Sequence, residues 1–309
     1  MNFLLIIGGL ILLVLGGNWL LKSAVALSLK LNISKVVIGM TVVSFATSAP
    51  ELIVSINAAL NGSPDLALGN VIGSNIANLG LVLGITLLLG TMKVAKGFYK
   101  LNWPVMMLAS GLLFLFLTND KVIMRYEGVL LFAFLVIFLI YLLKTQKNID
   151  LEDIDAETSL TGMKTMFYLI IGGFGLWAGS ELLIKGATAL ALDFGVTERV
   201  IGVTVVSIGT SIPELAASIV AIVKKEKAIS LGNLIGSNIF NVLAVIGITS
   251  IITPISLSDE KLLTSDIYWM LGISFIILPM VLLPKKYRLN WIEGSILLIG
   301  YATFIYMTL

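Results

Sequence analysis

The sequence predicts an all-α integral membrane protein whose ten transmembrane helices form two inverted five-helix repeats. The 309-residue chain is 58% hydrophobic and only 12% charged, with a mean hydropathy of +1.04, whereas a soluble domain has about 25% charged residues. Apolar runs of about 20 residues, the length that crosses a bilayer, recur along the chain. Residues 38–84 are repeated at 201–247, with about 25 identities in 47 aligned positions.

The apolar runs place the expected spans in order along the chain. They lie near 3–21, 36–60, 66–90, 102–118 and 124–143 in the first half, and near 163–184, 198–222, 229–252, 267–283 and 290–308 in the second. The stretch between the halves is acidic and favours a solvated linker. We therefore expect a first repeat at 1–143, a polar cytoplasmic linker at 144–162 and a second repeat at 163–309.

The basic residues predict the orientation of these spans. Of the 20 lysine and arginine residues, 15 fall in the odd-numbered connections and 5 in the even-numbered ones. Because positive charge stays on the cytoplasmic side, we expect both termini outside the plasma (cell inner) membrane. Each half has an odd number of spans, so the second half must lie upside down relative to the first. Inverted repeats with interrupted helices at matching positions are typical of secondary transporters.

Composition restricts the chemistry that the chain can perform. It contains no cysteine and no histidine, which excludes thiolate and imidazole metal ligands and the commonest catalytic bases. The net charge of +2 and the lack of a basic stripe argue against a nucleic-acid partner. Oxygen ligands remain, and these favour hard cations such as calcium and sodium. We expect no enzyme activity and no cofactor.

The repeated segment carries a proline and a glutamate within an apolar span. Pro50 in Thr47-Ser48-Ala49-Pro50-Glu51 removes a backbone donor and frees a carbonyl one turn earlier, near Ala46 and Ser44. The Glu51 carboxylate follows Thr47 and Ser48 by three to four residues, so it shares their helical face. Glu51 and its counterpart Glu214 are the only acidic residues that we place deep in the membrane. Burial there costs at least ~2.5 kcal/mol, which favours a functional role.

Further polar residues follow in the next span of each half. Ser74 and Asn78 are four residues apart, as are Ser237 and Asn241, so each pair shares a helical face. A lone membrane serine usually bonds its own helix, but the same set occurring twice favours a site. Calcium takes six to eight oxygens, and two carboxylates balance its charge. By contrast, we expect Asn75 and Asn238 to join helices, and Asn70 and Asn233 to lie at turns or helix starts.

The segments ATSAPEL and GTSIPEL, each followed about 20 residues later by GNVIGSNI or GNLIGSNI, resemble the alpha repeats of the calcium/cation antiporter superfamily. The resemblance is specifically to prokaryotic sodium/calcium exchangers. It covers both halves and implies their ten-helix inverted-repeat fold, with four cation sites and with spans one and six sliding past the core. By position, the resemblance implies these metal ligands: Glu51, Thr47, Ser48, Ser74, Asn78 and the Ser44 carbonyl from one half, and Glu214, Thr210, Ser211, Ser237, Asn241 and the Ser207 carbonyl from the other.

This chain departs from the family at one point. Family members often carry an acid at one of the positions that Asn78 and Asn241 occupy here, so the chain has two carboxylates in place of three. Two glutamates still balance one Ca2+ or two Na+. The departure leaves open whether a proton or potassium takes part.

We therefore expect a monomeric, multi-pass antiporter that exports Ca2+ in exchange for Na+ by alternating access. Its partners are inorganic cations and the lipid bilayer. A proton/calcium or potassium-dependent exchanger of the same fold is the nearest alternative. A passive cation channel is the next, although two related halves in one chain fit a carrier better. An intramembrane hydrolase would need a histidine, a cysteine or a lysine in mid-membrane, which the sequence does not offer.

Overall fold

A computed structural model describes residues 2–95, 97–145, 160–194, 209–283 and 287–308. Within them, eight helices are long and apolar enough to cross a membrane, or nine if the broken helix Lys35–Thr47 and Ala49–Leu60 counts as one span. Helices cover nine of the ten expected spans. α12 (Ile212–Val223) covers the later part of the tenth, at 198–222, and the earlier part lies outside the described residues. The protein is therefore a multi-pass helical membrane protein.

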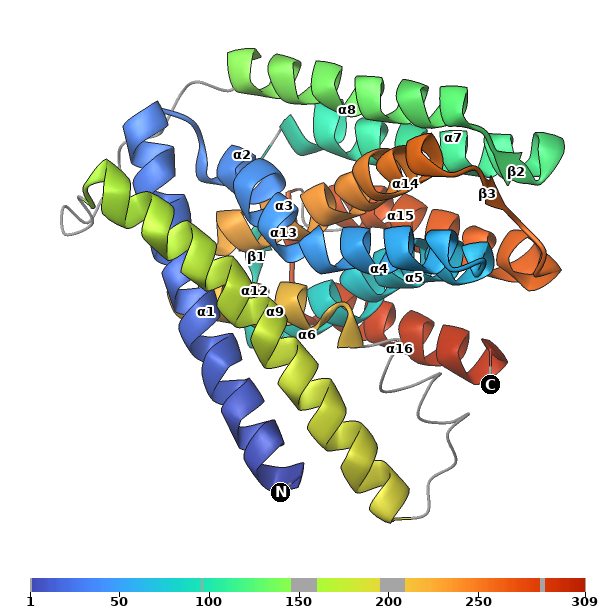
Figure 1. Ribbon diagram of the computed structural model, residues 1–309. Helices are drawn as coiled ribbons and strands as arrows, with labels where there is room; N and C mark the ends of the chain where they lie inside the picture. Colours follow the sequence, from blue (N-terminus) through green and yellow to red (C-terminus); the bar gives the residue numbers. More distant parts are fainter. Residues whose placement is uncertain (1, 96, 146–159, 195–208, 284–286, 309) are drawn as a thin grey trace. The chain divides into compact units, whose positions relative to one another are not determined.

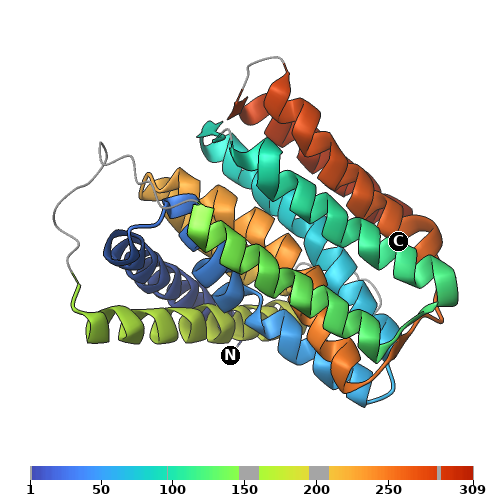
Figure 2. The ribbon, with the colours of Figure 1, turned by 90° about the horizontal axis from the view of Figure 1, so that it is seen from above.

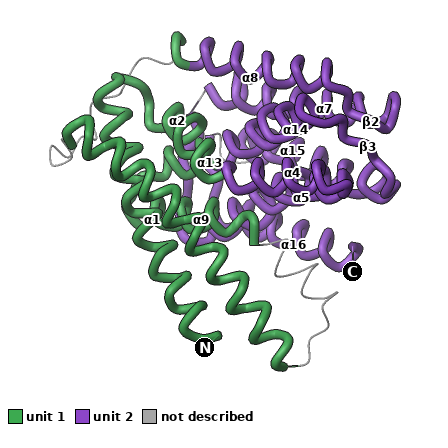
Figure 3. Tube along the Cα trace, viewed as in Figure 1, with its two compact units in different colours: residues 1–47, 143–233, 309 green, residues 48–142, 234–308 purple. Residues whose placement is uncertain are grey.

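The chain forms two compact units, and each unit contains segments of both halves of the sequence (Figure 3). Unit 1 comprises Met1–Thr47, Leu143–Asn233 and Leu309, and unit 2 comprises Ser48–Leu142 and Leu234–Thr308. Most of the expected linker at 144–162 lies outside the described residues. The divisions at Thr47 and Asn233 fall inside the repeated segments, so each copy contributes residues to both units.

Two long helices of unit 1 pack closely through glycines. α1 (Asn2–Leu31) and α9 (Gly162–Asp193) run side by side (Figures 1 and 2). A Cβ atom at Gly16 would lie 2.7 Å from the Leu176 nitrogen, and one at Gly179 would lie 2.9 Å from the Gly9 oxygen. Glycine therefore allows backbone-to-backbone contact, as in other membrane helix pairs. α1 extends about ten residues beyond its expected end, because no breaker intervenes before Asn32, whose φ of 54° is left-handed.

The remaining segments of unit 1 carry the polar repeat residues. They are α2 (Lys35–Ile38), the π-helical η1 (Gly39–Val43), α3 (Ser44–Thr47), α12, and the first half of α13 (Lys227–Phe240). η1 and α13 are in close backbone contact at Gly39 and Gly232. A Cβ atom on either glycine would crowd the Cα atom of the other. This close approach positions the backbone around Ser44 next to Asn233.

Two kinked helices form the centre of unit 2. The first consists of α5 (Pro64–Ala77), π-helical η2 (Asn78–Val82) and α6 (Leu83–Leu89). The second continues from α13 through π-helical η7 (Asn241–Ile246) to α14 (Gly247–Ile252). In these two spans 78% and 83% of an 18-residue stretch is buried, against 28–39% in the other six. The six outer spans therefore expose most of their residues, and these two spans form the protein interior.

Four outer helices and two short sheets complete unit 2. The helices are α7 (Trp103–Asp120), α8 (Arg125–Thr145), α15 (Ile267–Leu282) and α16 (Trp291–Thr308), and π-helical η3 (Phe98–Asn102) and η8 (Leu262–Asp266) precede α7 and α15. Gly128 of α8 packs on Gly247, and Gly294 of α16 packs on Gly84. β1 (Met92–Lys93) pairs antiparallel with β4 (Arg288–Leu289), and β2 (Val122–Ile123) with β3 (Ile255–Ser256).

The structure buries two further acidic residues, whose burial was not predicted from the sequence. Glu127 and Glu293 are 5% and 4% exposed. Each lies in the first turn of its helix and accepts a hydrogen bond from a preceding backbone nitrogen, at 2.8 Å from Met124 and 2.7 Å from Asn290. Such bonds satisfy helix-start donors. These two glutamates therefore cap helices.

Candidate functional site

In both copies of the repeat a helix begins directly after the same serine. Ser48 precedes α4 (Ala49–Leu60) with φ −89° and ψ 3°, and Ser211 precedes α12 with φ −89° and ψ 2°. This sparsely populated backbone region often holds active-site residues. Pro50 and Pro213 stand in the first turn of a new helix, where a missing N–H has no cost. The first copy thus has the interrupted helix that the sequence predicted, and its proline lies at the start of the second part.

In unit 2, Glu51 is completely buried in the first turn of α4. The Ser74 hydroxyl donates to its Oε1 at 3.3 Å. The Asn70 amide donates to its backbone oxygen at 3.3 Å and to the Ser55 hydroxyl, one turn along α4, at 3.0 Å. The positive end of the α4 dipole and the Ser74 hydroxyl both stabilise negative charge on this carboxylate.

A chain of amides joins the two kinked helices of unit 2. Asn75 Nδ2 donates to the Asn238 oxygen at 3.2 Å, and Asn238 Nδ2 donates back to the Asn75 oxygen at 3.1 Å. This reciprocal pair confirms the prediction that both asparagines join helices. Asn241 Nδ2 donates to the Ser74 hydroxyl and to Asn75 Oδ1, both at 3.1 Å. Ser74 therefore connects Glu51 of one half to Asn241 of the other half.

Two side-chain amides at the starts of π-helical segments have buried atoms without a hydrogen bond in the described chain. Asn78 is 0% exposed, and neither its Oδ1 nor its Nδ2 has a hydrogen-bond partner among the described residues. Asn241 Oδ1 is likewise buried and unbonded in the part of the chain described. Burying such atoms unpaired costs about 1–3 kcal/mol each, and π-helical turns are frequent at functional sites. An oxygen-seeking cation would satisfy both oxygens.

In unit 1, the counterpart glutamate and two hydroxyls are buried as well. Glu214 is 0% exposed in the first turn of α12. The Ser44 hydroxyl donates to the Gly39 and Asn233 oxygens at 2.8 and 2.9 Å. The Thr47 hydroxyl lies 3.2 Å from Asn233 Oδ1 and 3.4 Å from the Ser44 carbonyl. Two expected ligands thus meet at Asn233.

The expected ligands are distributed over the two units. Unit 2 holds Ser48, Glu51, Ser74, Asn78, Ser237 and Asn241, and unit 1 holds Ser44, Thr47, Thr210, Ser211 and Glu214. All of them are buried except Thr210, which is half-buried. Ser207 lies outside the described residues. Within unit 2, hydrogen bonds connect Glu51, Ser74 and Asn241.

The prediction for two asparagines of this site was wrong. Asn70 and Asn233 were expected at turns or helix starts, but each is the seventh residue of its helix, α5 or α13, and bonds a neighbouring helix or segment. Their repetition at the 163-residue offset was the signal that could have identified them. Glu181 and Lys185, four residues apart on α9, form an exposed ion pair at 3.9 Å.

The donor set of both units consists of oxygen and amide groups. The described residues contain no cluster of three or more acidic side chains that could hold a metal. A cation bound here would therefore combine each glutamate with neutral hydroxyl, amide and backbone oxygens. Such sets suit hard cations that are bound reversibly.

Comparisons with known proteins agree with this chemistry. The family model for sodium/calcium exchanger proteins matches residues 1–144 and 164–309. The chain is 38% identical to the "Putative antiporter CaxA" of Alkalimonas amylolytica over 97% of this chain and 96% of that protein. It is 30% identical to the sodium/calcium exchanger MaX1 of Methanosarcina acetivorans, over 98% and 97%. A solved structure of the sodium-calcium exchanger NCX_Mj superposes with a TM-score of 0.84 at 28% identity, covering 100% of this chain and 99% of that one.

Proposed function

Because the chain belongs to the sodium/calcium exchanger family, a family of membrane antiporters, we propose that it exports Ca2+ from the cell in exchange for Na+. We further propose that its ten spans form two inverted repeats with both termini outside. Transport then proceeds by alternating access around a midplane cation site. Potassium or protons as the coupling ion are the alternatives that the experiment below separates.

The observation that carries this proposal is the repeated helix start that contains a buried glutamate. Ser48 and Ser211 share their backbone conformation, and each precedes a helix with a proline and a glutamate in its first turn. Both glutamates are 0% exposed. A carboxylate that is buried twice at matching positions of an apolar chain suits a ligand of a transported ion.

In this proposal Glu51 and Glu214 act together as the charged ligands. Two carboxylates balance one Ca2+ or two Na+, so either ion set neutralises the site but both sets cannot bind at once. The remaining oxygens come from the Ser44 and Ser207 carbonyls, from the hydroxyls of Thr47, Ser48, Ser74, Thr210, Ser211 and Ser237, and from the Asn78 and Asn241 amides. A site with two bare carboxylates resists the rearrangement between access states, because uncompensated charge in the membrane is costly. Exchange is thereby coupled and leak is suppressed.

The test is uptake of radioactive calcium into proteoliposomes loaded in turn with sodium, potassium or buffer of low pH. We expect an outward sodium gradient alone to drive concentrative calcium uptake. Uptake that follows only the proton gradient, or that requires potassium together with sodium, would replace the proposed coupling ion. Calcium equilibration without any counter-ion would indicate a channel.

A further inference from the structure

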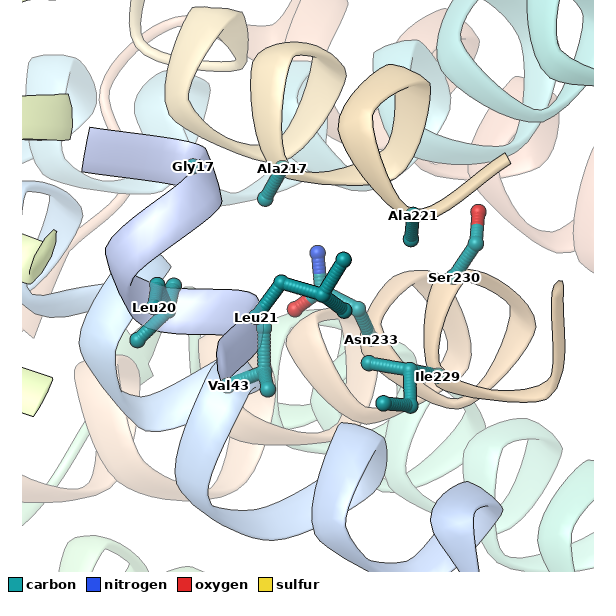
Figure 4. Close-up of a pocket in the computed structure, with 9 residues that line it drawn as sticks. All are labelled: Gly17, Leu20, Leu21, Val43, Ala217, Ala221, Ile229, Ser230 and Asn233. Carbon is teal, nitrogen blue, oxygen red and sulfur yellow. The ribbon is translucent and has the colours of Figure 1, made fainter. Parts of the chain in front are cut away.

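A small cavity lies inside unit 1, between α1, η1, α12 and α13 (Figure 4). Its volume is about 10 Å³, which is close to the space that one water molecule needs. Its lining consists mostly of apolar residues: leucine, valine, isoleucine, alanine and glycine. Only Ser230 and Asn233 bring polar groups to it.

The polar groups of this cavity have no protein partner in the described part of the chain. Ser230 is 0% exposed and Asn233 is 1% exposed. Ser230 Oγ and Asn233 Nδ2 make no hydrogen bond there. Figure 4 shows both groups turned towards the helix that carries Ala217 and Ala221. Buried polar groups in native proteins are almost always paired, either with protein or with an ordered water.

The other end of the Asn233 amide faces the proposed ion ligands. Its Oδ1 lies 3.2 Å from the Thr47 hydroxyl, and its backbone oxygen accepts from Ser44 at 2.9 Å. When Thr47 donates its proton to Asn233, the lone pairs of the hydroxyl remain available to a cation. A reversed amide would donate to Thr47 and occupy a lone pair. The orientation of this amide therefore decides how well Thr47 serves as a ligand.

The matching asparagine of the first copy is fixed without a cavity. Asn70 Nδ2 donates to Ser55 and to the Glu51 backbone. The residue that matches Ser230 is Ala67, which offers no polar group. Ser218 matches Ser55, yet its hydroxyl is unbonded within the described residues. The second copy therefore lacks the protein contacts that hold the amide in the first.

We propose that the cavity binds one water molecule, which accepts from Asn233 Nδ2 and donates to Ser230 Oγ. The bound water fixes the Asn233 amide and thereby keeps the Thr47 hydroxyl directed at the transported ion. Ser230 and Asn233 are thus positioning residues that act through Thr47, and this role rests on the proposed function. A metal ion does not suit the cavity, because one hydroxyl and one amide fall far short of the six to eight oxygens that calcium takes.

Equilibrium calcium binding to the purified protein in detergent tests this role. We expect Ser230→Ala to weaken binding by about threefold to tenfold, as for loss of one hydrogen bond. Ser218→Ala is the matched control, since Ser218 is an equally buried, unbonded serine that does not line the cavity, and it should bind like the wild type. In an Asn233→Leu background, Ser230→Ala should have no further effect, because residues acting through one contact are not additive.

The outcomes separate this inference from the proposed function. If the wild-type protein binds no calcium, the proposed function fails. If the wild type binds calcium and Ser230→Ala binds it equally well, or if the two substitutions are additive, the water-mediated role is wrong. Should the variants fold poorly, a high-resolution experimental structure of the wild type decides. A solvent peak within hydrogen-bonding distance of Ser230 Oγ and Asn233 Nδ2 is expected, and its absence would overturn the inference.

Discussion

The segments Ser48–Ala77 and Ser211–Phe240 share a backbone but differ in their hydrogen bonds. α4 and α12 have 12 residues each, α5 and α13 have 14 each, and the preceding serines agree within one degree. Asn70 nevertheless bonds Ser55, whereas Asn233 bonds Thr47 and leaves Ser218 unbonded among the described residues. Duplicated sequence therefore reproduces the main chain, while the side-chain network depends on what each copy packs against.

The difference extends to the asparagines at the π-helical starts. The Asn241 side chain donates to Ser74 and Asn75, but the side chain of its counterpart Asn78 makes no hydrogen bond within the described chain. If the two copies exchange roles as access alternates, as proposed, their side-chain contacts must differ in any one state. Ser230 and Ala67 differ in sequence, so that exchange cannot be complete.

The largest expected effect concerns the feature that the two segments share. Glu51→Gln and Glu214→Gln should each reduce sodium-driven calcium uptake by more than about 100-fold, since unit charges 4 Å apart interact by about 4 kcal/mol even in a partly polar medium. The measurement is radioactive calcium flux in proteoliposomes, with Glu181→Gln on the exposed surface as the control. Full exchange by either variant would show that the two glutamates are not equivalent ligands.

The next effect concerns how tightly a glycine is packed in each copy of the repeat. A Cβ at Gly232 would overlap the Val36 backbone oxygen, whereas one at Gly69 would meet only a Leu262 methyl group at 3.7 Å. Gly232→Ala should therefore destabilise the protein by about 1–3 kcal/mol or more. Gly69→Ala should be neutral or stabilise by up to about 1 kcal/mol, because alanine favours helix. Thermal unfolding in detergent compares the two, and equal Tm values would contradict the packing difference.

A smaller difference is expected between the two asparagines at the π-helical starts. Asn241→Asp removes two donated hydrogen bonds and places a carboxylate oxygen beside Asn75 Oδ1. Asn78→Asp adds the same charge without losing a bond in the described chain. Asn241→Asp should therefore be the less stable variant by about 1–3 kcal/mol. Thermal unfolding at one pH measures this order, and a less stable Asn78→Asp protein would reverse the assignment.

The smallest expected effect involves the serines that match in α4 and α12. Ser55 accepts the Asn70 amide at 3.0 Å, so Ser55→Ala should cost about 0.5–1.5 kcal/mol. Ser218 has no such bond among the described residues, and Ser218→Ala should leave stability close to that of the wild type. If both substitutions cost the same in chemical or thermal unfolding, the copies are bonded alike in solution.

Local patterns were enough to predict the helices and the interrupted spans. Apolar runs near 20 residues, the 163-residue repeat and the Ser-x-Pro-Glu segments located almost every described helix and the break between Thr47 and Ala49. The pairing between Ser74 and Asn241 was beyond such reasoning, because a helical period shows which residues share a face but not which helix that face meets. The burial of Glu127 and Glu293 was missed because their capping bonds depend on where the helices start.

The contrast between Asn70 and Asn233 was also beyond the sequence. Both stand in the same local motif, LGN followed by an IGSN segment, so no local rule distinguishes them. Their different partners follow from tertiary packing, with Asn233 beside Thr47 and Ser44. The π-helical segments that begin at Asn78 and Asn241 likewise leave no mark in the hydrophobic period.

The two short sheets make the halves of the sequence dependent on each other. Each pairs one strand from residues 1–143 with one from 163–309, with Met92 opposite Leu289 and Val122 opposite Ser256. A polypeptide that contained one half alone would leave both strand edges unpaired and open to a second molecule. We therefore expect neither half to complete unit 2 when it is produced without the other.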